Sequence, residues 1–141
     1  MQKRISDADP TLRVVIVTMD SHLAGAASRA LGLLRKELPG LSLTVHSADE
    51  WGSDPHALAR CHEDIARGDI IIATMLFLDD HIRAVMPALS ARRERCDAMV
   101  CCLSAGEVVR LTRIGKFNMA GESTGVMALL KRLRGNTKGA Q

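Results

Sequence analysis

Four short apolar runs, separated by segments with helical spacing, dominate the hydrophobic pattern of the chain. The runs are 13–18, 41–47, 69–74 and 98–104, and they are rich in valine and isoleucine, which favour strands. The first, third and fourth are apolar on successive residues, as expected for parallel strands covered on both faces, whereas the second alternates like an edge strand. The pattern therefore predicts four strands connected by helices.

Helical spacing fills the intervals between these strands. Leucine and alanine residues repeat at this spacing over 23–38 and predict a first helix, and residues 55–67 predict a second. The third helical segment, 78–96, contains Pro87. Because proline removes a hydrogen bond and clashes with the preceding turn, we expect a kink or two short helices there.

Strands that alternate with helices require right-handed crossovers and predict an α/β fold. Two more helices are predicted, over 105–117 and 123–135. We expect a three-layer, flavodoxin-like or Rossmann-like architecture, with a parallel sheet of four strands in the order 2-1-3-4 and helices on both faces. Residues 1–12 are predicted to be a disordered N-terminal segment, 13–135 a single α/β domain and 136–141 a polar tail.

Polar residues follow the first and third strands, which end side by side at the crevice where such sheets bind ligands. They are Asp20 and His22 after the first strand, and Asp79, Asp80 and His81 after the third. Carboxylates and imidazoles together could bind a small ligand or a divalent ion, or transfer protons. The same carboxylates could instead accept hydrogen bonds at the start of a helix. We prefer helix initiation, keep ligand binding open and assign no metal ligand or catalytic residue.

The fourth strand is followed by Ser104 and Glu107 with small residues between them. Backbone N–H groups at this point could bind an anion at a helix N-terminus. Glu107 would repel a phosphate, although it suits the first turn of a helix or a hydrogen-bonded ligand. Ser104 and Glu107 are therefore candidate ligand-binding residues with a structural alternative.

Composition narrows the class of protein. The chain has 141 residues, which suits one domain, and its charge is uneven, with a net charge of −3 over residues 1–107 and +6 over 108–141. The basic part is either a solvated helix face or a surface for an acidic partner or ligand. Only 2% of residues are aromatic, so the stacking platforms of nucleic-acid-binding proteins are missing.

Several motifs are absent from the sequence. The four cysteines show no CxxC spacing, which disfavours zinc and disulfide frameworks, and no apolar stretch has the length of a membrane span. A cytoplasmic location is expected. The segment 121–125 lacks the spacing and lysine of a phosphate-binding loop, and the first strand is followed by a single glycine, Gly25, so ATP and dinucleotides are not expected to bind.

Longer blocks of sequence carry a family resemblance. The blocks "VVIVTMDSHLAGA", "DIIIATMLFLDDHI" and "ARRERCDAMVCCLSAGEVVRLTRIGKF" resemble the N-terminal region of the large, porphyrin-binding H subunit of magnesium chelatase. The resemblance covers residues 13–135, and "TMDSHLAGA" is most similar to the form found in the bacteriochlorophyll pathway.

This resemblance implies membership of an ATP-dependent enzyme that inserts Mg²⁺ into protoporphyrin IX on the way to chlorophylls. The partners it implies are the two AAA+ motor proteins of that enzyme, the I and D subunits, and the remainder of the H subunit. The family's chelation regions lie beyond the end of this sequence, so the domain is expected to be inactive alone and to hold no cofactor. A flavodoxin-like module that binds a small ligand, either a porphyrin or an anion, is the alternative.

Overall fold

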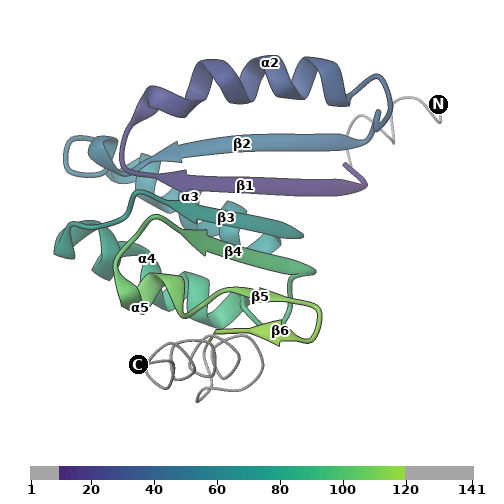
Figure 1. The fold of residues 1–141 in the computed structure, drawn as a ribbon. Helices are drawn as coiled ribbons and strands as arrows, with labels where there is room; N and C mark the ends of the chain where they lie inside the picture. Colours follow the sequence, from purple (N-terminus) through teal and green to yellow (C-terminus); the bar gives the residue numbers. More distant parts are fainter. Residues whose placement is uncertain (1–9, 120–141) are drawn as a thin grey trace, which may run out of the picture.

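The computed structural model describes residues 10–119 of the chain, which form one α/β unit (Figure 1). The predicted helix over 123–135 and the polar tail over 136–141 lie outside the described residues, as do residues 1–9 of the predicted N-terminal segment. The elements, in chain order, are β1 (Leu12–Thr18), η1 (Ser21–Leu23), α2 (Ala24–Leu34), β2 (Leu41–Ser47), η2 (Ala48–Glu50), α3 (Pro55–Arg67), β3 (Ile70–Thr74), α4 (Asp79–Arg92), β4 (Ala98–Cys102), α5 (Gly106–Val109), β5 (Arg113–Ile114) and β6 (Phe117–Asn118).

The sheet has the order β2-β1-β3-β4-β5-β6. The first four strands are parallel to one another, and the predicted order 2-1-3-4 is found for them. The prediction of a purely parallel, four-stranded sheet is wrong, because β5 and β6 add an antiparallel hairpin beside β4. Gly115 permits this hairpin, since its φ of 60° lies in the left-handed region that glycine adopts without steric penalty.

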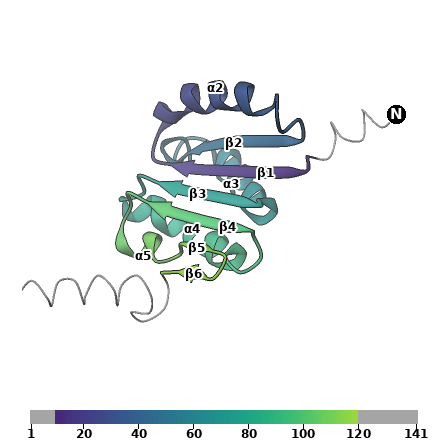
Figure 2. The same ribbon diagram turned by 45° about the vertical axis from the view of Figure 1, so that its right-hand side comes forward.

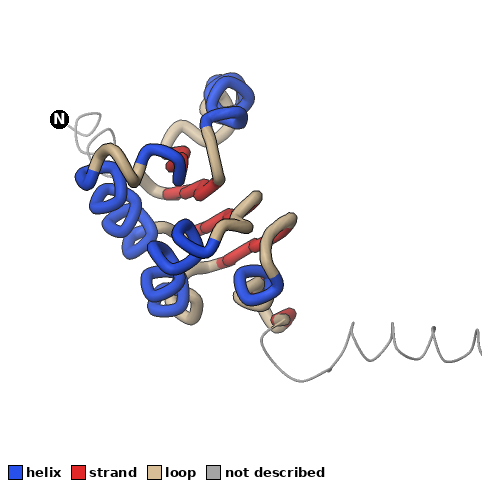
Figure 3. Tube along the Cα trace, turned by 90° about the vertical axis from the view of Figure 1, so that its left-hand side faces the viewer, coloured by secondary structure: helices blue, strands red, loops and turns tan. Residues whose placement is uncertain are grey.

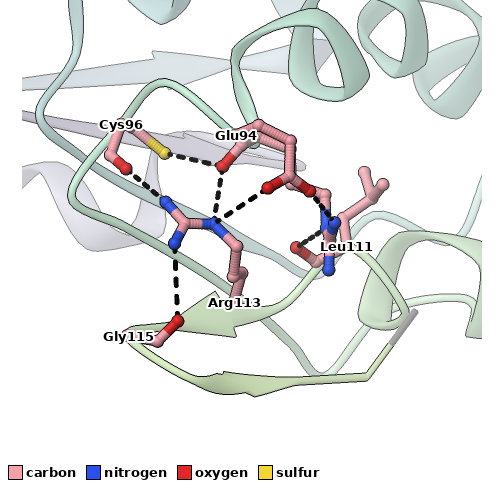
Figure 4. Close-up of polar contacts among 6 residues, drawn as sticks. Glu94, Cys96, Leu111, Arg113 and Gly115 are labelled. Atoms are coloured by element: carbon pink, nitrogen blue, oxygen red, sulfur yellow. Dashed lines mark hydrogen bonds and ion pairs between the residues drawn. The ribbon is translucent and has the colours of Figure 1, made fainter. Parts of the chain in front are cut away.

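The helix predicted over 105–117 is correspondingly wrong. Only α5 is helical there, and the chain then turns back to form the hairpin. Arg113 holds the hairpin in place (Figure 4): its Nε donates to the carbonyl oxygen of Arg93 at 2.9 Å, and its terminal nitrogens donate to the carbonyls of Cys96 and Gly115. Glu94 lies 3.9 Å from the same guanidinium. These bonds join β5 to the connection between α4 and β4.

Pro87 lies inside α4, which is assigned as one helix from Asp79 to Arg92. Of the two expectations, the division into two short helices is therefore wrong, and the kink stays a prediction. An interior proline costs about 3 kcal/mol of helix stability. The helix carries Ile82, Val85 and Leu89 into the core, and burial of each side chain contributes on the order of 1.5–3 kcal/mol. This burial is enough to offset the proline.

The helices lie on both sides of the sheet (Figures 2 and 3), with α2 over β2 on one face and α3 and α4 on the other. The face of the sheet under α3 and α4 is the buried one. The strand residues on this face are almost fully covered: Val15, Val17, Ile71, Ala73, Met99 and Cys101. The alternate residues of β1, β3 and β4, which face the side of α2, are half-buried apart from the last residue of each strand. The core therefore lies between the sheet and the helix pair α3 and α4.

No helix within residues 10–119 is both long enough and apolar enough to cross a membrane.

The cysteines of the core give a pH-dependent prediction. Burial raises the pKa of Cys61 and of Cys101 to about 12, so both thiols stay protonated in the folded chain. A thiol of the unfolded chain has a pKa of about 8.5, so the stability that these groups contribute is complete below that pH and falls as the pH rises toward 12. By about pH 10, the contribution of each thiol to the free energy of unfolding should have fallen by about 2 kcal/mol.

Urea denaturation at about pH 8 and about pH 10 measures this loss. A Cys61→Ala variant is the control, because it should be less stable at about pH 8 and should lose less stability between the two pH values. An unchanged pH dependence in this variant would contradict the assignment. Ellman's reagent provides a second check, since Cys102 is exposed and should react first, while Cys61, Cys96 and Cys101 are buried.

Candidate functional site

The carboxyl ends of the four parallel strands meet at one edge of the sheet, to which the arrowheads of β1 to β4 point in Figure 1. The last residues of β1, β3 and β4 are direct neighbours, because Thr18 pairs with Thr74 and Thr74 pairs with Cys102. The first and third strands thus end side by side, as the strand order predicts. We call the segments that follow these strand ends, 19–23, 48–54, 75–80 and 103–107, the tip surface.

Asp20 and His22 form one pair on the tip surface. The carboxylate of Asp20 caps η1 by accepting a 3.0 Å hydrogen bond from the backbone N–H of His22, and its Oδ1 also contacts Nδ1 of the His22 ring. The backbone hydrogen bond and then the ring lower the pKa of Asp20 from its ordinary value. The helix-starting alternative describes Asp20 well, because the residue closes the turn that leads into α2.

Asp79 and Asp80 lie in the first turn of α4, where the positive end of the helix dipole stabilises carboxylates. Both are exposed, and the residue that caps the helix is Leu78, which makes no side-chain hydrogen bond. His81 turns inward instead. Its ring meets Trp51 edge to face at 6.0 Å, and its Nδ1 is buried without a hydrogen-bond partner among the described residues.

Ser104 joins two of the tip loops. Its hydroxyl accepts a hydrogen bond from the N–H of Leu76 and donates one to the carbonyl of Cys102, both at 3.0 Å. Glu107 lies exposed in the first turn of α5. The structure therefore pairs Asp20 with His22, engages Ser104 in a loop contact, and leaves Asp79, Asp80 and Glu107 directed to solvent at helix starts.

Two left-handed residues shape the tip surface, and the sequence reasoning missed them. Met75 has a φ of 61° and Leu103 a φ of 46°, a conformation that is uncommon for residues other than glycine. The two meet directly, since the N–H of Met75 donates to the carbonyl of Leu103 at 2.9 Å, and the N–H of Ala105 donates to the carbonyl of Leu76 at 3.0 Å. The loops after β3 and β4 thus form one hydrogen-bonded unit.

This unit presents three large apolar side chains to solvent: Phe77 is 53% exposed, Leu78 56% and Leu103 70%. Strand ends at a ligand crevice usually carry polar residues, so the apolar "LFL" before Asp79 is a signal that the sequence offers. It points to a contact surface, because solvent-exposed apolar side chains that cluster mark interaction sites more often than isolated ones do.

Charge on the tip surface is of one sign. Its four segments contain no lysine or arginine, and their carboxylates are Asp20, Asp49, Glu50, Asp54, Asp79, Asp80 and Glu107. The tip surface is thus acidic as a whole. Within residues 10–119, no three histidine, cysteine, aspartate or glutamate residues are arranged to hold a metal ion.

Three hollows lie away from the tip surface, with volumes of about 250, 190 and 150 Å³. The first lies under α2 beside β2, the second at the opposite edge of the sheet around Arg13 and Arg67, and the third between α3 and α4. All three are smaller than the ~300–1,000 Å³ of a typical small-molecule site. None of them brings together the candidate residues that the sequence indicated.

Comparison with known proteins extends the family resemblance. The magnesium-chelatase H subunit of Cereibacter sphaeroides is 46% identical over 129 residues, which are 92% of this chain and 11% of that protein. The corresponding H subunit of Rhodobacter capsulatus is 40% identical over 89% of this chain and 10% of its own length. The chloroplastic ChlH protein of Oryza sativa subsp. indica, also a magnesium-chelatase subunit, is 25% identical over 92% of this chain. The chain spans about a tenth of the length of these relatives.

These identities confirm the resemblance to the N-terminal region of magnesium chelatase H subunits. The sequence profile of a family described as "Domain of unknown function (DUF3479)" matches residues 13–141, almost the whole chain. The chain therefore belongs to the DUF3479 family.

Proposed function

We propose that the chain is the N-terminal domain of a magnesium chelatase H subunit and has no catalytic role of its own. The observation that carries this proposal is the 46% identity to the H subunit of Cereibacter sphaeroides along 92% of the chain. The tip geometry agrees with it, because Asp20 and Ser104 make hydrogen bonds that hold the local fold together.

In this proposal the whole enzyme, and not this domain, uses Mg²⁺, ATP and protoporphyrin IX. The complete H subunit binds the porphyrin, and the AAA+ motor proteins, the I and D subunits, supply ATP hydrolysis. The domain contributes to the assembly as a structural or docking unit in the cytoplasm. The small-ligand alternative is less favoured, because the acidic tip surface would repel the propionates of a porphyrin.

A domain exchange tests this proposal. The matching N-terminal region of the Cereibacter sphaeroides H subunit is replaced by this chain, and the chimera is assayed with the motor subunits, ATP, Mg²⁺ and protoporphyrin IX. We expect magnesium porphyrin absorbance to appear at a rate comparable to that of the unaltered protein. An unrelated flavodoxin-like domain in the same position serves as the control and should give little product.

The isolated chain provides the complementary measurement. Mixed with the same motor subunits and substrates, it should give no magnesium porphyrin absorbance. Turnover by the chain alone would show that it is catalytic. A chimera no more active than the control with the unrelated domain would show that the chain does not serve as an H-subunit domain.

A further inference from the structure

The strongest unassigned feature of the molecule is the tip surface. Phe77, Leu78 and Leu103 are more than half exposed there, although leucine and phenylalanine are residues that proteins usually bury. They lie at the ends of the neighbouring strands β3 and β4, whose loops are joined by backbone hydrogen bonds. The backbone that carries these side chains is thus held in place, and the three side chains form an apolar patch open to a partner.

The charge around this patch determines the chemistry of that partner. Seven carboxylates and no lysine or arginine occupy the tip surface. The N-termini of the helices at this edge carry roughly +0.5 of a charge each and so offset about two of those seven negative charges. Arg60, on α3, lies 3.4 Å from Asp54 and pairs with one more. The remaining field repels nucleic acid, phosphate and anionic lipid, and it attracts a cationic surface.

The arrangement also indicates the shape of the partner. The strand order places Asp20, after β1, beside the loop of Phe77 and Leu78, while Asp79 and Asp80 follow Leu78 directly and Glu107 follows Leu103 in the segment after β4. An apolar patch bordered by carboxylates matches a helix that has an apolar stripe flanked by lysine and arginine.

We propose that the tip surface docks a basic amphipathic helix of a partner protein. The apolar stripe of that helix would cover Phe77, Leu78 and Leu103, and its flanking cations would lie against Asp20, Asp79, Asp80 and Glu107. This inference goes beyond the proposed function and does not depend on it, because it rests on the exposed side chains and the charge of the described residues alone.

The experiment uses the full chain and a fluorescein-labelled synthetic helix with leucines at helical spacing and lysines on both sides of the leucine stripe. Fluorescence anisotropy should show saturable binding that weakens as salt is added. The double variant Phe77→Ser/Leu103→Ser should weaken binding at least about tenfold, since it removes the apolar anchors. The double variant Asp79→Asn/Asp80→Asn should weaken it about threefold and reduce the salt dependence.

Matched controls keep the proposal falsifiable. Leu33 is 67% exposed on α2, outside the tip surface, so Leu33→Ser should leave binding unchanged. A peptide with glutamate in place of lysine, and vesicles that contain phosphatidylserine, should not bind. The proposal is overturned if the lysine peptide fails to bind, if Leu33→Ser weakens binding as much as the tip variants do, or if the glutamate peptide or the vesicles bind equally well.

Discussion

Leu76→Ala should lower the free energy of unfolding by about 3 kcal/mol, within the ~2–5 kcal/mol range measured when leucine is replaced by alanine in protein cores. Leu76 is fully buried although both of its neighbours in sequence are partly or mostly exposed. Its backbone is fixed on both sides, because its N–H donates to Ser104 and its carbonyl accepts from Ala105. The side chain therefore anchors both tip loops to the core, and its loss leaves a cavity that these loops cannot close easily.

Leu78→Ala is the matched control, because it makes the same chemical change two residues away on a side chain that is 56% exposed. Its effect should stay within about 0.5 kcal/mol, as for most surface substitutions. Urea denaturation followed by circular dichroism measures both variants. Similar losses for Leu76→Ala and Leu78→Ala would show that the tip loop is not anchored in the way described.

Thr112→Val should cost about 3 kcal/mol, although valine has nearly the same shape as threonine. The hydroxyl of Thr112 accepts a hydrogen bond from the N–H of Cys101 and donates one to the carbonyl of the same residue, both at 3.0 Å. β5 pairs with β4 only at Ala98 and Met99, so Cys101 has no backbone partner on β5. The hydroxyl of Thr112 takes the place of that partner. Valine would leave both backbone groups buried and unpaired, at about 1–3 kcal/mol each.

Thr44→Val on β2 provides the comparison, since Thr44 is half-buried and its hydroxyl makes no hydrogen bond within residues 10–119. That substitution should change stability by less than about 0.5 kcal/mol. The midpoint of urea denaturation distinguishes the two variants. A loss for Thr44→Val as large as that for Thr112→Val would mean that the paired hydroxyl is not what matters at position 112.

The parts of the fold that the sequence predicted correctly are those that depend on local pattern. The apolar runs over 13–18, 69–74 and 98–104 became parallel strands, and the residues between them formed α2, α3 and α4. The hairpin was missed because its stability comes from distant partners. Nothing local to Arg113 indicates that its guanidinium will reach the carbonyls of Arg93 and Cys96.

The features of the candidate site also fall into those that local sequence predicts and those that depend on distant segments. The capping role of Asp20 follows from its place between a strand and a helix, so the sequence could predict it. The inward turn of His81 toward Trp51 and the loop contact of Ser104 could not be predicted, because each depends on a segment far away in the chain. The exposure of Phe77 is of the same kind, since only the folded chain shows which side of a loop faces solvent.

The left-handed backbone at Met75 and Leu103 bears on any effort to make this domain more robust. Non-glycine residues in that conformation cost on the order of 1 kcal/mol each, so glycine would be the obvious choice for a protein engineer who seeks a higher melting temperature. At Leu103 that choice would remove the most exposed apolar side chain of the tip. Thermal stability and the proposed helix docking therefore compete at this single position, and leucine keeps the apolar side chain that docking would use.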